Sequence, residues 1–231
     1  MSTPALKVTN LSVWFENGSE RLVVVDQISF SINAGDATGL VGESGCGKTM
    51  TAMAILGLLT TPGIKVSSDG IEINGRDIST LTDNRRRAVL GRDIAMIFQQ
   101  PATALDPVFT MGQQISAVYR RHRGGNKQQA RKNMLQALEG VGFRNAADIA
   151  ASYPHELSGG MRQLAMIAMA TICKPAVIIA DEPTTALDNS SRVLILGQLK
   201  HLQKLHRTAI LFISHDLAVV RHICRDVLVM Y

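Results

Sequence analysis

The chain has 231 residues, 46% of them hydrophobic and 19% charged, so it can bury a sizeable core and is not disordered, collagen-like or coiled-coil. No apolar run reaches the roughly 18 residues that a membrane-spanning helix needs. The excess of 24 Lys and Arg over 19 Asp and Glu is mild, and three widely spaced cysteines form no disulfide framework, which favours a reducing, cytoplasmic setting.

The N-terminal part of the chain is rich in short β-branched and apolar runs that end at Asn or Gly, a pattern typical of strands. These predicted strands cover 6–14, 22–25 with 28–32, 37–41, 71–73 and 94–98. A glycine-rich turn follows the run at 37–41, and the apolar segment 50–59 then predicts a buried helix. Strand, glycine loop and helix in this order form the first half of an α/β phosphate-binding unit.

The second part of the chain alternates between helix and strand patterns. Between residues 101 and 170 the helix formers dominate, with helices predicted at 128–141 and 161–173. The run 176–180 is typical of a buried parallel strand. Afterwards the pattern predicts a helix at 193–205, a strand at 209–213, a helix at 217–224 and a strand at 227–231. A β/α core with a helical insertion accounts for this order, and we expect a truncated chain because it stops inside the last strand.

A phosphate-loop pattern, GxxxxGK[ST], lies between the strand 37–41 and the helix 50–59. Its members are Gly42, Glu43, Ser44, Gly45, Cys46, Gly47, Lys48 and Thr49. The glycines let backbone N–H groups surround phosphate oxygens, and the following helix points the positive end of its dipole at them. Lys48 can reach the β- and γ-phosphates, and the Thr49 hydroxyl can bind Mg²⁺. The alternative, a glycine-rich turn with a solvated lysine, is disfavoured by the strand before it and the helix after it.

Two carboxylates directly follow the predicted strand 176–180. Parallel sheets bind their ligands at the carboxyl ends of their strands, so Asp181 is expected to hold Mg²⁺ and Glu182 to polarise an attacking water. Taken alone, two solvated acids at a strand end explain the pattern about equally well. The phosphate loop earlier in the chain favours the catalytic interpretation.

A second glycine-rich turn precedes the predicted helix 161–173. Ser158 is a good N-cap, and Gly159 and Gly160 expose backbone N–H groups that can bind an anion. A capped helix with a flexible entry turn explains these residues equally well. Both interpretations stay open on physical grounds alone.

Taken together, these motifs resemble those of the ATP-binding cassette (ABC) family, whose signature segment is LSGGQ. Residues 157–161 read LSGGM here, and Gln99, after the segment MIF, resembles the Q-loop glutamine. Asp188, in the segment TALD, resembles the D-loop aspartate, and His215, in SHD, resembles the switch histidine. Phe15 resembles the aromatic side chain that stacks on adenine, and Trp14 is the alternative for this position.

The resemblance implies an α/β fold with a P-loop NTPase (RecA-like) core, an N-terminal antiparallel β subdomain and an inserted α-helical subdomain. The expected nucleotide-binding domain spans 1–231, with the catalytic core and β subdomain in 1–98 and 171–231 and the helical insertion in 99–170. It also implies binding of ATP and Mg²⁺, with Gln99 near the metal and His215 near the γ-phosphate. In the family two cassettes pair, so that the Ser158 turn of one chain meets the nucleotide of the other.

Longer segments resemble the branch that imports oligopeptides, dipeptides and nickel. They are 99–107 (QQPATALDP), 153–163 (YPHELSGGMRQ) and 180–188 (ADEPTTALD). Met161 replaces the usual Gln, and Leu164 and Asp106 stand where many relatives carry Arg and Asn. These departures bear on the transported solute and not on the ATPase.

The resemblance implies an ATP-hydrolysing importer subunit on the cytoplasmic face of the inner or plasma membrane. Its expected partners are integral-membrane permease subunits, a second ABC ATPase subunit, identical or not, and indirectly a solute-binding protein, but no nucleic acid. The alternative is a non-transport ABC ATPase that acts on DNA or ribosomes. Such proteins usually carry a long coiled coil or two tandem cassettes, whereas only 108 residues separate Lys48 from Leu157 here, without sustained heptads.

Overall fold

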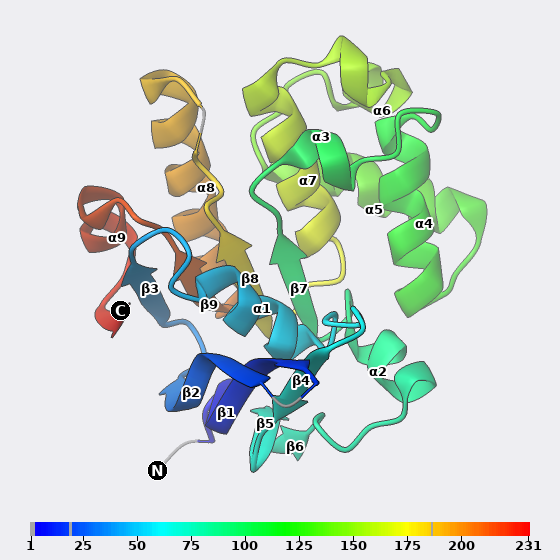
Figure 1. Cartoon of the computed structure of the whole chain (residues 1–231). Coiled ribbons are helices and arrows are strands. Elements are labelled where there is room, and N and C mark those ends of the chain that lie inside the picture. The colour runs from blue at the N-terminus through cyan, green and yellow to red at the C-terminus, as the bar shows by residue number, and fades with distance from the viewer. Residues whose placement is uncertain (1–2, 19, 186) are drawn as a thin grey trace.

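The structure, a computed structural model, describes residues 3–18, 20–185 and 187–231. It contains two sheets and a group of helices (Figure 1). The first sheet is antiparallel, in the order β2-β1-β5-β6, with β4 also paired to β1. Its strands are β1 (Leu6–Asn17), β2 (Glu20–Ile32), β4 (Ile64–Ser67), β5 (Gly70–Ile73) and β6 (Arg76–Asp77).

Two features of this sheet differ from the predicted strands. The runs 22–25 and 28–32 belong to one strand, β2. Between them Gln27 adopts a φ of 45°, and its N–H donates to Ser12 Oγ at 2.9 Å. This irregular, polar position interrupts the sequence pattern without ending the strand. The short strand β4 is largely exposed, so it lacks the buried alternation from which strands are predicted.

The second sheet is parallel and has the order β10-β3-β9-β8-β7. Its strands are β3 (Ala37–Gly42), β7 (Ile94–Ile97), β8 (Val177–Asp181), β9 (Ala209–Ile213) and β10 (Asp226–Met230). Both β8 and β9 are buried along their whole length, which explains their continuous apolar runs. Because Leu40 and Asp181 both pair with Ile213 of β9, the carboxyl ends of β3 and β8 lie at one edge of the sheet.

Ten helical segments complete the described part of the fold. They are α1 (Lys48–Leu56), α2 (Asp83–Val89), α3 (Pro101–Ala104), α4 (Met111–Arg123), α5 (Lys127–Gly140), α6 (Ala146–Ala151), a 3₁₀ turn (Pro154–Glu156), α7 (Gly159–Thr171), α8 (Asn189–His206) and α9 (Leu217–Ile223). The helices at 50–59, 128–141, 161–173, 193–205 and 217–224 were predicted, with ends that shift by a few residues. The helices α2, α3, α4 and α6 were not.

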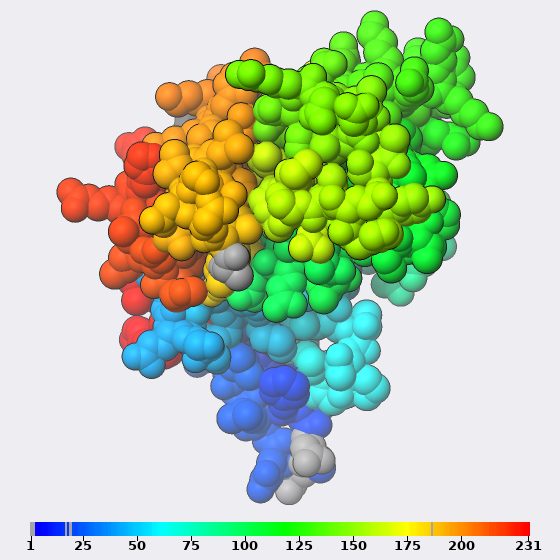
Figure 2. All heavy atoms as spheres, turned by 90° about the horizontal axis from the view of Figure 1, so that it is seen from above, coloured from blue at the N-terminus to red at the C-terminus, as the bar shows by residue number. Residues whose placement is uncertain are grey.

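The helices α3 to α7 form the green and yellow-green part of the molecule, which lies beside the parallel sheet (Figure 1). Helix α7 connects the two regions, because it packs against β7 and α8 on one side and against α4 and α5 on the other. The predicted helical insertion, 99–170, ends one residue before the end of α7. Seen from above, this helical region lies next to α8, while the N-terminal strands project from the opposite end (Figure 2). Within the described ranges, no helix has both the length and the hydropathy that crossing a bilayer requires.

Candidate functional site

The predicted phosphate loop connects β3 to α1 and curls around the Lys48 side chain. Gly45 and Gly47 have φ angles of 88° and 98°, a left-handed conformation that glycine adopts without strain. The Lys48 Nζ atom donates to the carbonyl oxygens of Gly42 at 2.8 Å and Glu43 at 2.7 Å, and it lies 3.6 Å from Cys46 Sγ. Only 6% of Lys48 is exposed, so the loop holds a buried cation among its backbone groups.

Asp181 is the last residue of β8 and is 3% exposed. Burial raises the pKa of its carboxyl above the ordinary value, a hydrogen bond from Thr49 opposes this shift, and the neighbouring Glu182 carboxylate adds to it. Within the described residues, the Oδ1 atom of Asp181 has no hydrogen-bond partner. A buried carboxylate oxygen of this kind is costly unless a donor or a cation meets it.

Three side chains hold the carboxylate of Glu182, the next residue. Oε2 accepts a hydrogen bond from Gln99 Nε2 at 3.0 Å and another from Thr185 Oγ1 at 2.9 Å. Oε1 lies 2.9 Å from Nδ1 of His215, which must carry the proton because a carboxylate only accepts. Burial alone would raise the pKa of Glu182, but the hydrogen bonds from His215 and Thr185 outweigh it, so this pKa lies below its ordinary value.

Lys48, Glu182 and the side chains that hold Glu182 line one cavity of about 530 Å³. Its lining includes Ser44, Lys48 and Thr49 of the phosphate loop together with Gln99, Glu182 and His215. Residues more than a hundred positions apart in the sequence thus meet at the carboxyl edge of the parallel sheet, where such sheets bind ligands. The cavity combines a cation, a carboxylate and backbone N–H groups, which suits it to a phosphate ester and its hydrolysis.

Sequence reasoning missed the contact of Thr185 with Glu182. We assigned Thr185 only to the D-loop segment, although its position three residues after Glu182 is short enough for a local hydrogen bond to the carboxylate. Ala186 of the same segment lies outside the described residues.

The predicted signature residues lie at the start of α7, next to the start of α8. Ser158 caps α7 by accepting a hydrogen bond from the Met161 N–H at 3.2 Å. A Cβ atom on Gly160 would come within 2.7 Å of Ser191 Oγ, so a larger residue here would displace the Ser191 side chain at the start of α8. Ser158, Gly159 and Gly160 do not line the cavity of about 530 Å³ in their own chain.

Asp188 lies at the start of α8, next to the signature residues. It caps α8 by accepting a hydrogen bond from the Ser191 N–H at 2.9 Å, and its carboxylate also accepts one from Ser191 Oγ at 2.7 Å. Hydrogen bonds from Ser190 and Ser191 hold the pKa of this carboxyl below its ordinary range. Asp188 is outside the lining of the phosphate-loop cavity as well.

The two aromatic candidates for adenine stacking lie side by side on β1. Phe15 is 39% exposed, which leaves its ring accessible, but it does not line the phosphate-loop cavity. The ring of Trp14 is covered by the Arg21 guanidinium, 4.0 Å from its centroid, in a cation–π contact. Because Trp14 is already occupied, Phe15 is the better candidate of the two.

Comparison with known proteins decides the family. The family model described as ABC transporter matches residues 25–185. The chain belongs to the ABC transporter family. It is therefore an ATP-binding and ATP-hydrolysing cassette, and the expected fold, a P-loop α/β core with an antiparallel sheet and added helices, is confirmed.

The relatives of this ABC cassette include transport proteins and solved cassettes. It is 43% identical over 226 residues to the dipeptide transport ATP-binding protein DppD of Escherichia coli K12, covering 98% of this chain and 69% of the relative. It is 43% identical to the oligopeptide transport ATP-binding protein AppD of Bacillus subtilis 168, covering 100% and 70%. A dimeric ATP-binding cassette, MJ0796, solved in a post-hydrolysis state with ADP and Pi, superposes with a TM-score of 0.84 at 25% identity, covering 97% and 94%.

Proposed function

We propose that this ABC cassette energises peptide uptake through a membrane permease, acting on the cytoplasmic face of the inner or plasma membrane. The names of the relatives support peptides rather than nickel as the solute class, and a solute-binding protein would deliver the peptide on the far side. The geometry that carries the ATPase part is the Glu182 carboxylate, held by Gln99, Thr185 and His215 at the phosphate-loop cavity.

In this proposal Lys48 and the N–H groups of the phosphate loop bind the β- and γ-phosphates of ATP. Glu182, ionised because of its lowered pKa, orients a water and accepts its proton while the water oxygen bonds to the γ-phosphorus. The bond between that phosphorus and the bridging oxygen of ADP then breaks. His215 Nδ1 keeps the Glu182 carboxylate in place and presents its ring to the departing phosphate.

The residues at the end of β8 fit a Mg²⁺ ion. Mg²⁺ is usually held by one or two carboxylates together with hydroxyl, water and phosphate oxygens. Asp181 offers a buried Oδ1 without a partner among the described residues, and Thr49 and Gln99 add a hydroxyl and an amide oxygen. When bound, the ion would neutralise charge on the β- and γ-phosphates.

Pairing of two cassettes would give the signature turn a function. Ser158, Gly159 and Gly160 present a hydroxyl and N–H groups at a helix start but contact no nucleotide cavity of their own chain. In the proposed pair they would donate to the γ-phosphate bound by the other chain. ADP lacks this phosphate and would not hold the pair together.

ATP should therefore drive dimerisation. We expect the Glu182→Gln protein, which retains ATP, to shift from monomer to dimer in light scattering with ATP and not with ADP. Ser158→Arg should abolish this shift, because its bulk would occupy the phosphate position. Ser67→Arg, on the exposed strand β4, is the matched control. If neither this chain alone nor a mixture with its natural second ATPase subunit gains mass with ATP, the shared-site proposal is wrong.

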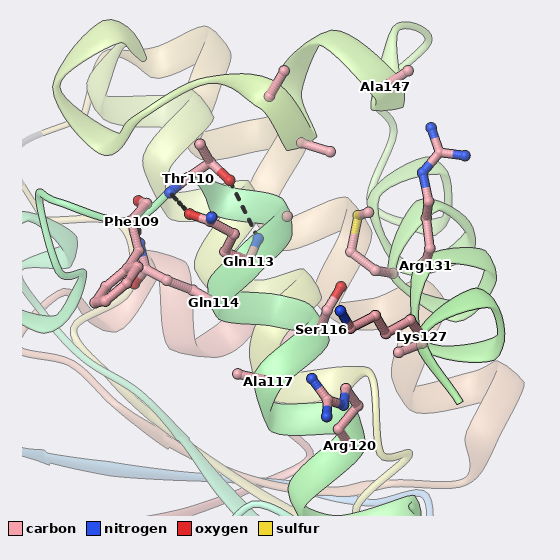
Figure 3. Close-up of a pocket in the computed structure, with 15 residues that line it drawn as sticks. Phe109, Thr110, Gln113, Gln114, Ser116, Ala117, Arg120, Lys127, Arg131 and Ala147 are labelled. Atoms are coloured by element: carbon pink, nitrogen blue, oxygen red, sulfur yellow. Dashed lines mark hydrogen bonds between the residues drawn. The ribbon is translucent and has the colours of Figure 1, made fainter. Parts of the chain in front are cut away.

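A groove between α4, α5 and α6 is the proposed docking surface for the permease (Figure 3). Its volume is about 790 Å³, and Phe109, Met134 and several alanines line it. Three cations, Arg120, Lys127 and Arg131, also line it, and among the residues that the structure describes no acidic side chain does. An apolar groove with a cationic rim is complementary to an amphipathic helix that carries acidic residues beside its apolar face, so this is the permease segment we propose.

Charge reversal in this groove should weaken permease binding. For the double variant Lys127→Glu, Arg131→Glu we expect at least a tenfold loss of affinity for the permease in detergent, because like charges would face each other across the interface. Reversing two exposed cations elsewhere on the helical region, Lys132→Glu with Arg144→Glu, is the control for net charge. Equal losses for both double variants would contradict the proposed surface.

A further inference from the structure

A group of basic side chains gathers at the end of the parallel sheet opposite the nucleotide cavity. Arg92 precedes β7, Lys174 precedes β8, and His206 and Arg207 precede β9, so they lie at the amino ends of these strands. Arg123, the last residue of α4, joins them. These five residues, called here the basic bowl, line a cavity of about 570 Å³.

The positive charge of the basic bowl is only partly balanced. Within the described ranges, Asp93 is the one residue with a carboxylate that lines the cavity, and Arg92 binds it through two hydrogen bonds of 3.0 and 2.7 Å. Arg123 donates to the backbone carbonyl of Cys173. In the described part of the chain, Lys174 and Arg207 take part in no ion pair. The cavity therefore holds a surplus of cations.

Burial and the neighbouring cations both act on the pKa of His206. Burial lowers the pKa of this imidazole, and the nearby charge of Lys174 lowers it further. His122 behaves alike, since burial and then the charges of Arg121 and Arg92 lower its pKa. At both imidazoles the nearby cations thus add to the effect of burial.

The backbone at two of these cations is unusual. Lys174 and Arg207 have φ angles of 48° and 53°, a left-handed conformation that glycine normally occupies. Arg207 ends α8 at the position where glycine is most common. Long cationic side chains stand at both positions, although glycine would fit the backbone better.

Each cation also lies at the end of a helix or shortly after it, where it complements the negative end of the dipole. The helix dipole explains why each of these side chains, taken by itself, is positively charged. It does not explain why they converge on one concave surface whose carboxylate is already paired. The dipole explanation predicts an effect on stability only, whereas a ligand site also predicts that an anion binds.

We propose that the basic bowl binds the phosphate group of a small phosphorylated molecule or of a lipid headgroup. Arg207, Lys174 and Arg123 would supply charge-assisted hydrogen bonds, and the planar guanidinium groups match two phosphate oxygens at once. This site is separate from the ATP cavity, because it lies at the amino ends of the parallel strands and the ATP cavity lies at their carboxyl ends.

Calorimetry with inorganic pyrophosphate tests the proposal in the Lys48→Ala background, which disables the phosphate loop. We expect binding that weakens as salt is added, and a dissociation constant at least about tenfold higher in Lys174→Gly, Arg207→Gly. Glycine suits the left-handed backbone at both positions, so this double variant should fold. Arg85→Ala with Lys132→Ala removes two exposed cations elsewhere and should leave the constant unchanged. Equal pyrophosphate binding by the glycine variant would overturn the proposal, and so would a protein that binds neither pyrophosphate nor the vesicles described next.

Vesicles distinguish the two sources of phosphate. Sedimentation of the Lys48→Ala protein with phosphatidylglycerol vesicles, but not of its glycine double variant, would assign the site to lipid headgroups. Pyrophosphate binding without sedimentation would assign it to soluble phosphorylated molecules. ATP binding by the protein with Lys48 intact is measured alongside, so failure of this site is distinguishable from failure of the nucleotide site.

Discussion

Glu182→Gln is expected to lower the ATP turnover number at least roughly a hundredfold while leaving ATP binding intact. Glutamine has the same shape and can still contact Gln99, Thr185 and His215, but it cannot accept a proton from water. Steady-state phosphate release measures the turnover, and equilibrium binding of a fluorescent ATP analogue measures the affinity. Glu139→Gln, on the exposed side of α5, is the matched control. Hydrolysis by Glu182→Gln at the parent rate would show that another group activates the water.

The lowered pKa of Glu182 also predicts how the stability of the fold depends on pH. A carboxyl whose pKa is lower in the folded than in the unfolded protein stabilises the fold above its ordinary value of 4.5, and this contribution disappears as the pH falls through the folded value. Unfolding by urea should therefore show less loss of stability on acidification in Glu182→Gln than in the parent. An identical pH dependence would mean that His215 and Thr185 do not favour the ionised carboxylate.

Lys48→Ala is expected to raise the dissociation constant for ATP at least roughly a hundredfold, since charge-assisted hydrogen bonds contribute about 1.5–3 kcal/mol each. The Lys48 ammonium is the buried cation of the phosphate loop, where two carbonyl groups hold it. Titration calorimetry with ATP measures the change, and Lys132→Ala, an exposed lysine of α5, controls for net charge. The fold should persist, because the loss of Lys48 leaves the apolar core untouched. An unchanged constant would remove Lys48 from the proposed phosphate contacts.

The predicted elements were most reliable where one feature of the sequence dominates. The strands at 176–180 and 209–213 are continuous apolar runs because both faces of β8 and β9 are buried. Short or amphipathic elements were missed. Helix α4 has an apolar stripe between polar residues, and it begins at a capping box formed by Thr110 and Gln113 that we did not recognise.

The phosphate loop and the acidic pair each depend on residues that are neighbours in the sequence, so the sequence by itself determined them. The spacing of the glycines determines the turn, and the end of the apolar run places Asp181 at the end of a strand. The order of the motifs also sufficed for the family. Contacts between distant segments depend on how the sheets and helices pack, which no local pattern encodes. Only the tertiary structure decided that Gln99 and His215 hold Glu182, that the signature turn is not part of its own chain's cavity, and that five basic residues meet at the opposite end of the sheet.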